Sequence, residues 1–474
     1  MVKAVFVDLF PTMFDAHGIY SLSAVCRRAG IDVDYVGERR FVTACDKVVA
    51  TGASFVLYSS FSATAGEYEE FDRMLKKRIN VTSVIGGPGP TFDRGDSNEV
   101  SIDAFCIGEG EDALPAFIAE GKTDRNIRRS GDGVTPTCYY PFTDLDALPF
   151  PDRSIVYRHD SFRRTKSVKH FLSGRGCPYD CSFCFNHAYR EIFRGSGKPV
   201  RKKSVDYFIE EMLQVRREYG FVSAAFSDDT FILDKKWLQK FCSAFAEKIG
   251  TPYTCGVRAN LMDDDTARML RESGCSAVNW SIEAGDETLR NDVLKRNMSD
   301  EQIIRTAELL HKYKISFLTG NIIGSPGETF AQMDKTVHLN IRVKPALALA
   351  KIFAPYPGLA LTDYAIKNGF YDGIVKPGKD DLYSRSLLNY TLSEKVNIQK
   401  LMTLFPLFVS FGFLFTNNLM KKLLFAFPAA ALRIVYELFS GYRTMRLYVV
   451  RTPFSQKVRM LIRYLVNIVP VFRR

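Results

Sequence analysis

Residues 177–184 read CPYDCSFC and place three cysteines in the spacing C-x3-C-x2-C. The segment follows an apolar run at residues 169–173 that is typical of a β-strand, so the thiols are expected on a loop at the carboxyl end of that strand. Pro178, Asp180 and Ser182 separate the thiols and are typical of an exposed loop. Three unrelated buried cysteines are therefore disfavoured, and the loop is predicted to bind a metal centre.

Two kinds of metal centre are compatible with this loop. Cys177, Cys181 and Cys184 can bind three irons of a [4Fe-4S] cluster and leave the fourth iron without a protein ligand, open to a substrate. A structural zinc ion would need a fourth ligand to close its tetrahedron, and His187 stands three residues further on. The sequence favours the iron–sulfur cluster and keeps zinc as the alternative.

The chain around and beyond this loop alternates strands and helices. A helix at Val205–Tyr219 ends before Gly220, and Ser299 with Gln302 matches a capping box at the start of another helix. Such alternation implies parallel pairing, but six units are too few for an eight-stranded barrel. Residues 166–385 are therefore predicted to form a partial (β/α)6 barrel. Its strands are expected at residues 169–173, 222–227, 253–257, 277–282, 316–323 and 347–353.

The first 122 residues show the same alternation in shorter units. Glycine-rich segments at residues 86–90 (GGPGP) and 108–111 (GEGE) follow two of the expected strands, at the edge where parallel sheets bind ligands. The fold class is therefore α/β, with a Rossmann-like, doubly wound parallel sheet over residues 1–122 and a linker over residues 123–165. The strands of this sheet are expected at residues 4–9, 32–36, 55–59, 81–85 and 104–107.

Composition fits a folded cytoplasmic protein. The 474 residues are 46% apolar and 25% charged, which excludes disordered, collagen-like and multi-span membrane chains. Asp8 interrupts the first apolar run too early for a secretory signal, so a cytoplasmic location is expected. Ten cysteines in such a chain favour metal or redox chemistry over disulfides. The seven cysteines outside the triplet are expected to be small buried apolar residues: Cys26, Cys45, Cys106, Cys138, Cys242, Cys255 and Cys275.

The C-terminal region has a different character. Residues 401–474 hold eleven Lys or Arg and one acid, Glu437, so they carry 11 − 1 = +10 of the total charge of +11. The nearly neutral remainder disfavours nucleic-acid binding. Residues 401–420 carry no charge, but Pro406 and Gly412 weaken a membrane span. Residues 386–474 are therefore predicted to be helical, with re-entrant or in-plane amphipathic helices on the inner face of a membrane favoured over a cap packed on the barrel.

The cysteine motif resembles that of the radical S-adenosylmethionine (SAM) superfamily, whose fold is a partial (β/α)6 barrel. Four later segments extend this resemblance: residues 226–231, 282–285, 321–329 and 355–358. The resemblance implies SAM contacts after successive strands, listed here with Phe183 of the cysteine loop: Phe183, Ser227, Asp228, Arg258, Glu283, Gly324 and Pro326. The alternatives are ordinary: a turn or helix cap for Asp228, and an ion pair with Asp263 or Asp264 for Arg258. Tyr356, in the loop after the sixth strand, is expected either to face substrate or to be a packed loop aromatic.

The N-terminal segments at residues 85–91, 108–111 and 145–151 resemble the cobalamin-binding (B12-binding) subgroup of this superfamily. The resemblance implies cobalamin contacts at Ser59, Gly86, Gly87, Pro88 and Glu109. Residues 15–20 (DAHGIY) depart from the Asp-x-His-x-x-Gly loop that supplies a histidine to cobalt in other corrinoid proteins. Cobalamin would therefore bind without a lower histidine ligand, and His17 is expected to be a turn residue.

The resemblance implies an enzyme that reductively cleaves SAM to a 5′-deoxyadenosyl radical and uses cobalamin to methylate a carbon of a lipid-like or natural-product substrate. A flavodoxin- or ferredoxin-type protein would supply the electron. One alternative is a radical SAM cyclase or coupling enzyme that does not use cobalamin. The other is a non-catalytic, metal-stabilised binding protein at a membrane.

Overall fold

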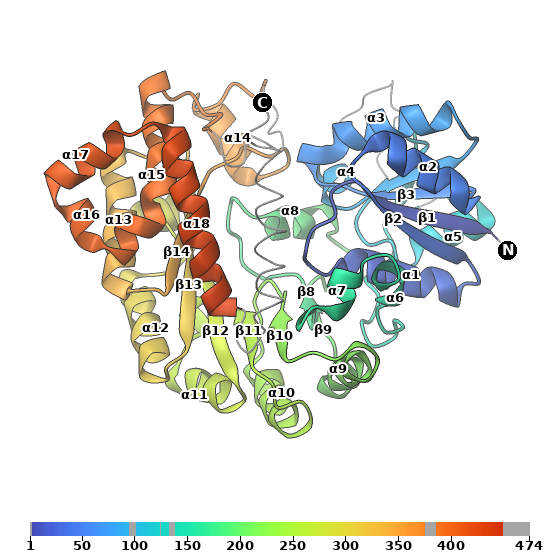
Figure 1. Cartoon of the computed structure of the whole chain (residues 1–474), viewed down its shortest axis with the longest axis horizontal. Coiled ribbons are helices and arrows are strands. Elements are labelled where there is room, and N and C mark those ends of the chain that lie inside the picture. The colour runs from blue at the N-terminus through green and yellow to red at the C-terminus, as the bar shows by residue number, and fades with distance from the viewer. Residues whose placement is uncertain (1, 94–100, 124, 132–137, 375–384, 449–474) are drawn as a thin grey trace.

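The computed structural model describes residues 2–93, 101–123, 125–131, 138–374 and 385–448. Two six-stranded sheets lie side by side, one at the N-terminus and one in the middle of the chain, and helices from the C-terminal part cover the outer side of the second sheet (Figure 1). The strands of both sheets alternate with helices, so the predicted α/β fold class is confirmed.

The N-terminal sheet has the strand order β2-β1-β3-β4-β5-β6. Its first five strands are parallel, and the sixth pairs antiparallel with β5. The order 2-1-3-4-5 is that of flavodoxin-like sheets, whose ligands bind at the carboxyl ends of the strands. The strands are β1 (Lys3–Asp8), β2 (Asp32–Gly37), β3 (Phe55–Ser59), β4 (Thr82–Gly86), β5 (Ala104–Cys106) and β6 (Ile127–Arg129).

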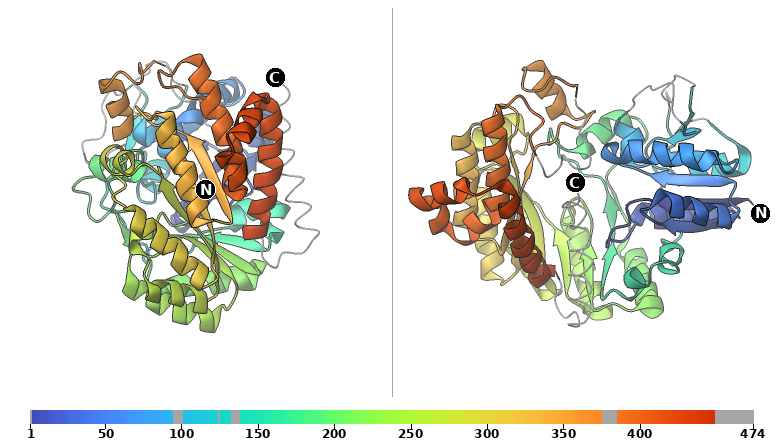
Figure 2. Two further views of the ribbon diagram at one scale, coloured as in Figure 1. Left: turned by 90° about the vertical axis from the view of Figure 1, so that its left-hand side faces the viewer. Right: turned by 45° about the horizontal axis from the view of Figure 1, so that its top comes forward.

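Helices cover both faces of this sheet (Figure 2). Tyr20 of α1 and Phe117 of α5 pack in one apolar cluster, whereas Val48 of α2 and Phe71 of α3 pack in a second cluster on the other face. The predicted double winding is therefore present. The helices are α1 (His17–Arg28), α2 (Phe41–Thr51), α3 (Ala65–Lys76), α4 (Pro88–Phe92) and α5 (Ala113–Glu120).

The segment expected to be a linker has structure of its own. Strand β6 extends the N-terminal sheet, and two short helices, α6 (Ser154–Tyr157) and α7 (Ser161–Thr165), lead to the second sheet. Asn126 explains why β6 pairs at this edge: its side chain donates to the carbonyl of Ile107 at 2.7 Å and accepts from the amide of Tyr140 at 2.8 Å. Such tertiary hydrogen bonds leave no periodic signal in the sequence.

The second sheet contains six parallel strands in the order β14-β13-β12-β11-β10-β7, as the partial barrel requires. These strands are β7 (Val168–Phe171), β10 (Ser223–Phe226), β11 (Tyr253–Gly256), β12 (Cys275–Glu283), β13 (Ser316–Ile323) and β14 (Leu347–Ile352). The helices between them are α8 (Phe185–Ile192), α9 (Val205–Tyr219), α10 (Lys235–Lys248), α11 (Asp264–Glu272), α12 (Asp300–Lys312) and α13 (Phe330–Val343), and α14 (Ala360–Lys367) follows β14. The predicted cap of Ser299 and Gln302 begins α12.

A small antiparallel ribbon stands at the entry to the cysteine loop. Strand β8 (Gly174–Arg175) pairs with β9 (Arg201–Lys202), which returns after α8. The cysteine loop and α8 therefore form one excursion between the two strands of this ribbon.

The C-terminal helices are α15 (Leu392–Ser410), α16 (Gly412–Thr416), α17 (Asn418–Ala426) and α18 (Ala429–Tyr448). Leu404, Phe405 and Phe408 of α15 are fully buried with Val337 of α13 and Ile352 of β14. Residues 401–410 are therefore a packed cap on the barrel, and the predicted membrane contact is wrong for this part of the region because burying these side chains against the barrel removes them from any other surface.

The exposed remainder of the region is different, since α17 has no buried residue. Among the described residues no single helix has the length and composition of a membrane span, although α17 and α18 pass that test together while bent by 109°. Residues 449–474, also part of the predicted helical region, lie outside the described residues, as do residues 375–384 of the predicted barrel.

Candidate functional site

The cysteine loop is fixed from several sides at the carboxyl end of the barrel. The hydroxyl of Ser182 donates to the carbonyl of Val293 at 2.7 Å, and the backbone carbonyl of Ser182 accepts from the amide of Leu361 at 2.9 Å. Arg190 of α8 donates to the carbonyls of Cys177 and Tyr179. The loop is thus held in place by protein contacts alone, as a preorganised metal site requires.

The three thiols differ in burial. Cys181 is buried, whereas Cys177 and Cys184 are half-buried. Burial raises the pKa of the Cys184 thiol to about 11, so this thiol is neutral until a metal displaces its proton. A cluster would therefore bind with proton release.

The zinc alternative lacks its fourth ligand in this arrangement. His187 places Nδ1 3.3 Å from Asp180 Oδ1. In the described ranges no three His, Cys, Asp or Glu side chains converge on one ion. The irons of a cubane occupy separate corners, so thiolates that bind one need not converge on a single point.

Two guanidinium groups face Cys181. Arg258 Nη1 lies 3.5 Å and Arg296 Nη1 3.6 Å from the Cys181 sulfur. The Nε atom of Arg296 is buried without a hydrogen-bond partner. Two cations and an unused donor beside one thiol fit an anionic group at this position, which is what a thiolate-bound cluster and a carboxylate-bearing ligand would supply. The residues present therefore fit the cluster.

Glu283, the last residue of β12, completes this charged group. Its backbone has φ +68°, a strained conformation for a residue with a side chain and one that is concentrated at functional sites. Burial raises the pKa of the Glu283 carboxyl, while the nearby Arg296 charge opposes that shift. The predicted acidic position thus lies beside the same arginines as Cys181.

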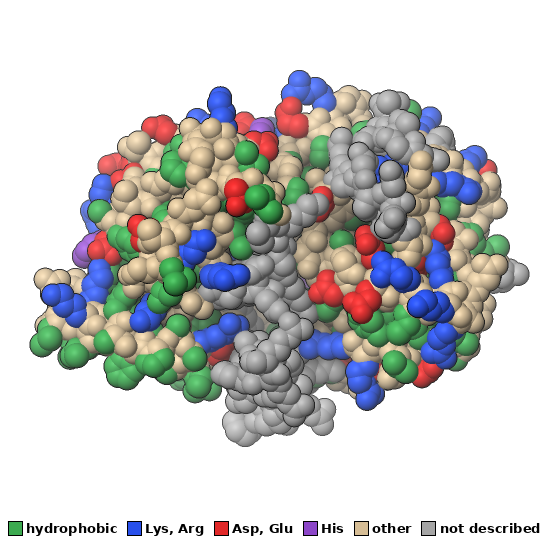
Figure 3. Space-filling view, turned by 90° about the horizontal axis from the view of Figure 1, so that it is seen from above, with side chains coloured by type: hydrophobic (Ala, Val, Ile, Leu, Met, Phe, Trp, Pro, Cys, Tyr) green, Lys and Arg blue, Asp and Glu red, His purple; other side chains and the backbone are tan. Residues whose placement is uncertain are grey.

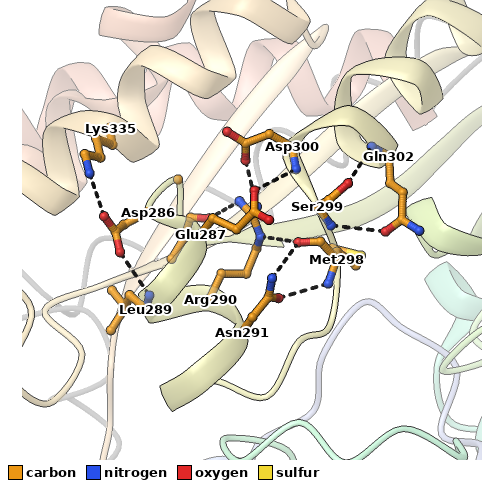
Figure 4. A network of polar contacts seen from close by, with 12 residues as sticks. Asp286, Glu287, Leu289, Arg290, Asn291, Met298, Ser299, Asp300, Gln302 and Lys335 are labelled. Atoms are coloured by element: carbon orange, nitrogen blue, oxygen red, sulfur yellow. Dashed lines mark hydrogen bonds and ion pairs between the residues drawn. The ribbon is translucent and has the colours of Figure 1, made fainter.

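The segment between Glu283 and Arg296 is held by Arg290, a buried arginine that pairs with the half-buried Asp300 (Figure 4). Arg290 is fully buried and donates to Asp300 at 2.7 Å and to the carbonyl of Ala284 at 2.9 Å. The amide of Arg296 in turn donates to the carbonyl of Arg290 at 2.9 Å. This network fixes both ends of the segment that joins Glu283 to Arg296.

Arg296 was not predicted from the sequence. It stands in a polar segment, Lys295-Arg296-Asn297, that reads as an exposed turn. The signal that could have found it is positional, because a cation shortly after the carboxyl end of a strand that carries a predicted site residue is close to that site in a parallel barrel.

Of the two predicted contacts after β10, Ser227 is exposed, whereas Asp228 is buried and accepts from the Ser173 amide at 3.0 Å and the Ser173 hydroxyl at 2.5 Å. The neighbouring Asp229, which was not predicted, is exposed. The Asp228 carboxylate therefore joins β10 to the residue that precedes β8. Both aspartates line a cavity of about 340 Å³ together with Gly176 and Thr230.

The remaining predicted SAM contacts lie at the other side of the barrel mouth. Gly324 and Pro326 are buried in the turn after β13, where Tyr390 donates its hydroxyl to the carbonyl of Ser325 at 2.8 Å. Phe183 is half-buried and packs in an apolar cluster with Ala284, the residue after Glu283. These three residues therefore lie around the end of β12 and β13 and not beside Asp228.

The predicted cobalamin residues lie at the carboxyl edge of the N-terminal sheet. Ser59 ends β3, Gly86 ends β4, and Gly87 and Pro88 begin α4. Gly87 has φ +93°, and a Cβ there would lie 2.9 Å from the carbonyl of Ser60, so the turn requires glycine. This glycine therefore lets the turn before α4 pack closely on the residue that follows β3.

Glu109, the fifth predicted cobalamin residue, forms ion pairs across the domain boundary. It pairs with Arg201 of β9 and lies 3.2 Å from Arg175 of β8. Arg175 also lies 2.5 Å from Glu111, which is buried and accepts from the Ser21 hydroxyl at 2.8 Å. The loop at residues 108–111 is thus attached to the ribbon that leads into the cysteine loop.

The histidine of the loop after β1 has a different environment from that of a corrinoid ligand. His17 begins α1 and is not a turn residue as predicted. Asp15 accepts from the hydroxyls of Tyr20 at 3.0 Å and Tyr157 at 2.7 Å and from the amide of His170 at 2.8 Å. The carboxylate that could orient a metal-binding imidazole is therefore used to join the N-terminal domain to β7.

A third contact between the domains is aromatic. The ring of Phe92, at the end of α4, lies 4.4 Å from the ring of Phe185, which follows Cys184. Phe185 lies 5.8 Å from the ring of Tyr356 in the loop after β14. Tyr356, the predicted substrate residue, therefore belongs to an aromatic cluster with Phe185, which follows the cysteine loop, and Phe92 of the N-terminal domain.

Two segments of the chain match known protein families, one in the N-terminal part and one in the middle. Residues 171–339 match the radical SAM superfamily, and residues 6–118 match the B12 binding domain. The chain therefore contains a radical SAM domain and, before it, a B12-binding domain, which confirms the predicted resemblance.

Individual relatives agree with this assignment. An uncharacterised methyltransferase of Pyrococcus horikoshii is 27% identical over 308 residues, which are 61% of this chain and 64% of the relative. The chain spans about three-fifths of the length of the curated relatives it matches.

Solved structures show the same fold. OxsB, a cobalamin-dependent SAM radical enzyme with aqua-cobalamin and SAM bound, has a TM-score of 0.68 at 13% identity and covers 98% of this chain and 75% of its own. The radical SAM methyltransferase TsrM of Kitasatospora setae, with cobalamin and a [4Fe-4S] cluster bound, has a TM-score of 0.64 at 14% identity and covers 80% of this chain and 76% of its own.

Proposed function

We propose that the protein is a cobalamin-dependent radical SAM methyltransferase that methylates a carbon of a lipid-like or natural-product substrate. The observation that carries the proposal is that the carboxyl edge of the N-terminal sheet contacts the carboxyl edge of the barrel. The loop after β5 is ion-paired with the ribbon after β7, and the end of α4 contacts Phe185 and the loop after β14. Ligands bound at the two edges would therefore share one space.

The barrel residues would hold the cluster and SAM. Cys177, Cys181 and Cys184 bind iron, and Arg258 and Arg296 neutralise the cluster and orient the SAM carboxylate. When bound, these groups supply a 5′-deoxyadenosyl radical and cobalamin supplies the methyl group. Further contacts to SAM come from Phe183, Ser227, Asp228 with its exposed neighbour Asp229, Glu283, Gly324 and Pro326.

The N-terminal residues Ser59, Gly86, Gly87 and Pro88 would hold cobalamin through close backbone contacts. Glu109 has its charge satisfied by Arg201 and Arg175, so its part is to position the loop beside the cofactor. A histidine lower ligand is not required, in keeping with the engagement of Asp15 elsewhere.

The substrate would be a small molecule with an apolar part. TsrM has been solved with its tryptophan substrate, and a further relative is named a cytidylyl-2-hydroxyethylphosphonate methyltransferase, so relatives act on small molecules. Tyr356 with Phe92 and Phe185 offers aromatic faces next to the cysteine loop, which suit an apolar or conjugated group. A flavodoxin- or ferredoxin-type protein would supply the electron.

Anaerobic reconstitution tests the proposal. Protein loaded with iron, sulfide and hydroxocobalamin should show both corrinoid and iron–sulfur absorption, and SAM with reductant should give 5′-deoxyadenosine. Cluster absorption without corrinoid binding would favour the cyclase or coupling alternative. Zinc-loaded protein that forms no 5′-deoxyadenosine would favour the binding protein.

Arg296 allows a sharper test of the SAM site. Arg296→Met should weaken SAM binding to the reconstituted protein by about 10–100-fold, with partial recovery in Arg296→Lys. Arg194→Met, which removes an exposed ion pair with Glu191, is the matched control. Unchanged SAM affinity in Arg296→Met would remove this residue from the proposed site.

A further inference from the structure

Exposed apolar side chains are concentrated on the last described helices. Of the twenty large apolar side chains that are exposed in the described part of the chain, ten lie between residues 411 and 442. Hydrophobic side chains gather along the lower left edge of the molecule in Figure 3, where α16–α18 lie. These ten residues form the C-terminal apolar surface: Phe411, Phe413, Leu419, Met420, Leu423, Phe427, Ile434, Val435, Leu438 and Tyr442.

Helix α18 is apolar on two faces. Leu432 and Leu447 are buried toward the protein, at 5% and 6% exposure. Ile434, Leu438 and Tyr442 stand at intervals of four residues and are exposed at 47%, 58% and 54%. Exposed apolar patches of this kind mark interaction sites, so the outer face of α18 is expected to have a partner.

The neighbouring α17 has the same pattern with nothing buried. Leu419 and Leu423 stand four residues apart on this helix, and Phe427 follows at the next interval of four. All three side chains are more than half exposed. The two helices thus present two apolar stripes outward on the same part of the molecule.

The charge of this region decides between partners. Residues 411–447 contain five Lys or Arg and one acid, a net charge of 5 − 1 = +4. Lys422 and Arg446 are exposed within the stripes. Residues 449–474, whose sequence adds six bases and no acid, would bring like charge, and so would a second copy of this surface. An anionic lipid surface offers both an apolar layer and opposite charge.

We propose that α16–α18 dock in the plane of an anionic lipid bilayer through the C-terminal apolar surface. The apolar stripes enter the boundary between headgroups and acyl chains, and the flanking bases contact the headgroups. The packed α15 connects this surface to the barrel, so docking holds the barrel at the membrane without inserting it.

Vesicle flotation of the full chain tests the proposal. The protein should float with vesicles of phosphatidylcholine and phosphatidylglycerol and bind phosphatidylcholine vesicles at least about tenfold more weakly. Leu423→Asp with Leu438→Asp should lose at least about tenfold in binding. The matched control is Val42→Asp with Ile366→Asp, which adds the same charge at exposed apolar positions on α2 and α14 and should bind like the original chain.

Lys422→Glu with Arg446→Glu separates the electrostatic contribution. This variant should lose most of the preference for phosphatidylglycerol, about tenfold or more. Failure of the original chain to float, or equal flotation of the Leu423/Leu438 variant, would overturn the proposal. A dimer in light scattering would also overturn it, if the Leu423/Leu438 variant is monomeric and neither protein floats with vesicles. Cofactor binding is measured separately by absorption, so either proposal can fail alone.

Discussion

The carboxyl edges of the two parallel sheets are built differently. The barrel edge concentrates buried charge around one thiol, with Arg258 and Arg296 beside Cys181 and with Glu283 in a strained conformation. The N-terminal edge is made of glycine-rich turns, and the charges of its loop at residues 108–111 are paired with the barrel. One edge is organised internally, whereas the other depends on its neighbour.

This difference has a functional meaning. A cluster and a sulfonium ligand need charged groups in fixed positions, because electrostatic interactions are strong only where water is excluded and the groups are preorganised. A large corrinoid needs open backbone that a flat ring can approach. The ion pairs between Arg175 and the loop at residues 108–111 would hold the two edges in a fixed position relative to each other.

The largest effect is expected from the barrel edge itself. Cys181→Ala should abolish cluster binding and 5′-deoxyadenosine formation, since three protein thiolates are the minimum for this kind of site. Iron content and the absorption of reconstituted protein measure it. The matched control is Cys138→Ala, because Cys138 lies outside the loop and is exposed, contrary to the prediction of a buried residue. Full iron content in Cys181→Ala would contradict the cluster assignment.

The link between the edges comes next. Arg175→Met leaves the buried Glu111 without its cation, and loss of one partner of a buried pair costs about 3–5 kcal/mol. Urea unfolding should show this loss, whereas the exposed pair removed in Arg194→Met should cost about 0–1 kcal/mol. Corrinoid binding should weaken in Arg175→Met as the loop at residues 108–111 detaches. A variant as stable as the original chain would show that the two edges are independent.

The barrel edge is also supported from outside by α15. Leu404→Ala creates a cavity at a fully buried position and should cost about 2–5 kcal/mol. Leu423→Ala, on the exposed α17, should change the free energy of unfolding by no more than about 0.5 kcal/mol. Chemical denaturation of the two variants tests whether the packed cap and the exposed surface are distinct. Equal destabilisation would mean that α17 is packed as well.

The sequence predicted the local elements of both edges better than the contacts between them. The parallel strands of both sheets and the cysteine loop follow from local periodicity and spacing, which are read along the chain. Arg296 and the pairing of Glu109 with Arg201 depend on residues that meet only after the barrel closes, so no local pattern marks them. The membrane contact predicted for residues 401–410 was wrong for a related reason, because an uncharged segment has the same composition whether it packs on a barrel or lies on a membrane.

The last prediction concerns the turn after β13. Glu328 is 3% exposed, accepts from the Ser325 amide at 2.9 Å and has a second oxygen without a partner. Burial raises the pKa of this carboxyl from 4.5 to about 8, so the folded protein keeps a proton that the unfolded chain releases above pH 4.5. Stability should therefore fall as the pH rises from about 4.5 to 8, by at most about 1.4 kcal/mol per pH unit.

Glu328→Gln should remove that slope, because the amide keeps the acceptor oxygen and has no proton to lose. Urea midpoints of the original chain, the variant and the exposed control Glu308→Gln, measured at several pH values in this range, would show it. Parallel pH profiles for all three would mean that Glu328 is ionised in the folded protein. The turn that carries Gly324 and Pro326 would then contain a buried negative charge, and the barrel edge would hold one more anion than this structure assigns to it.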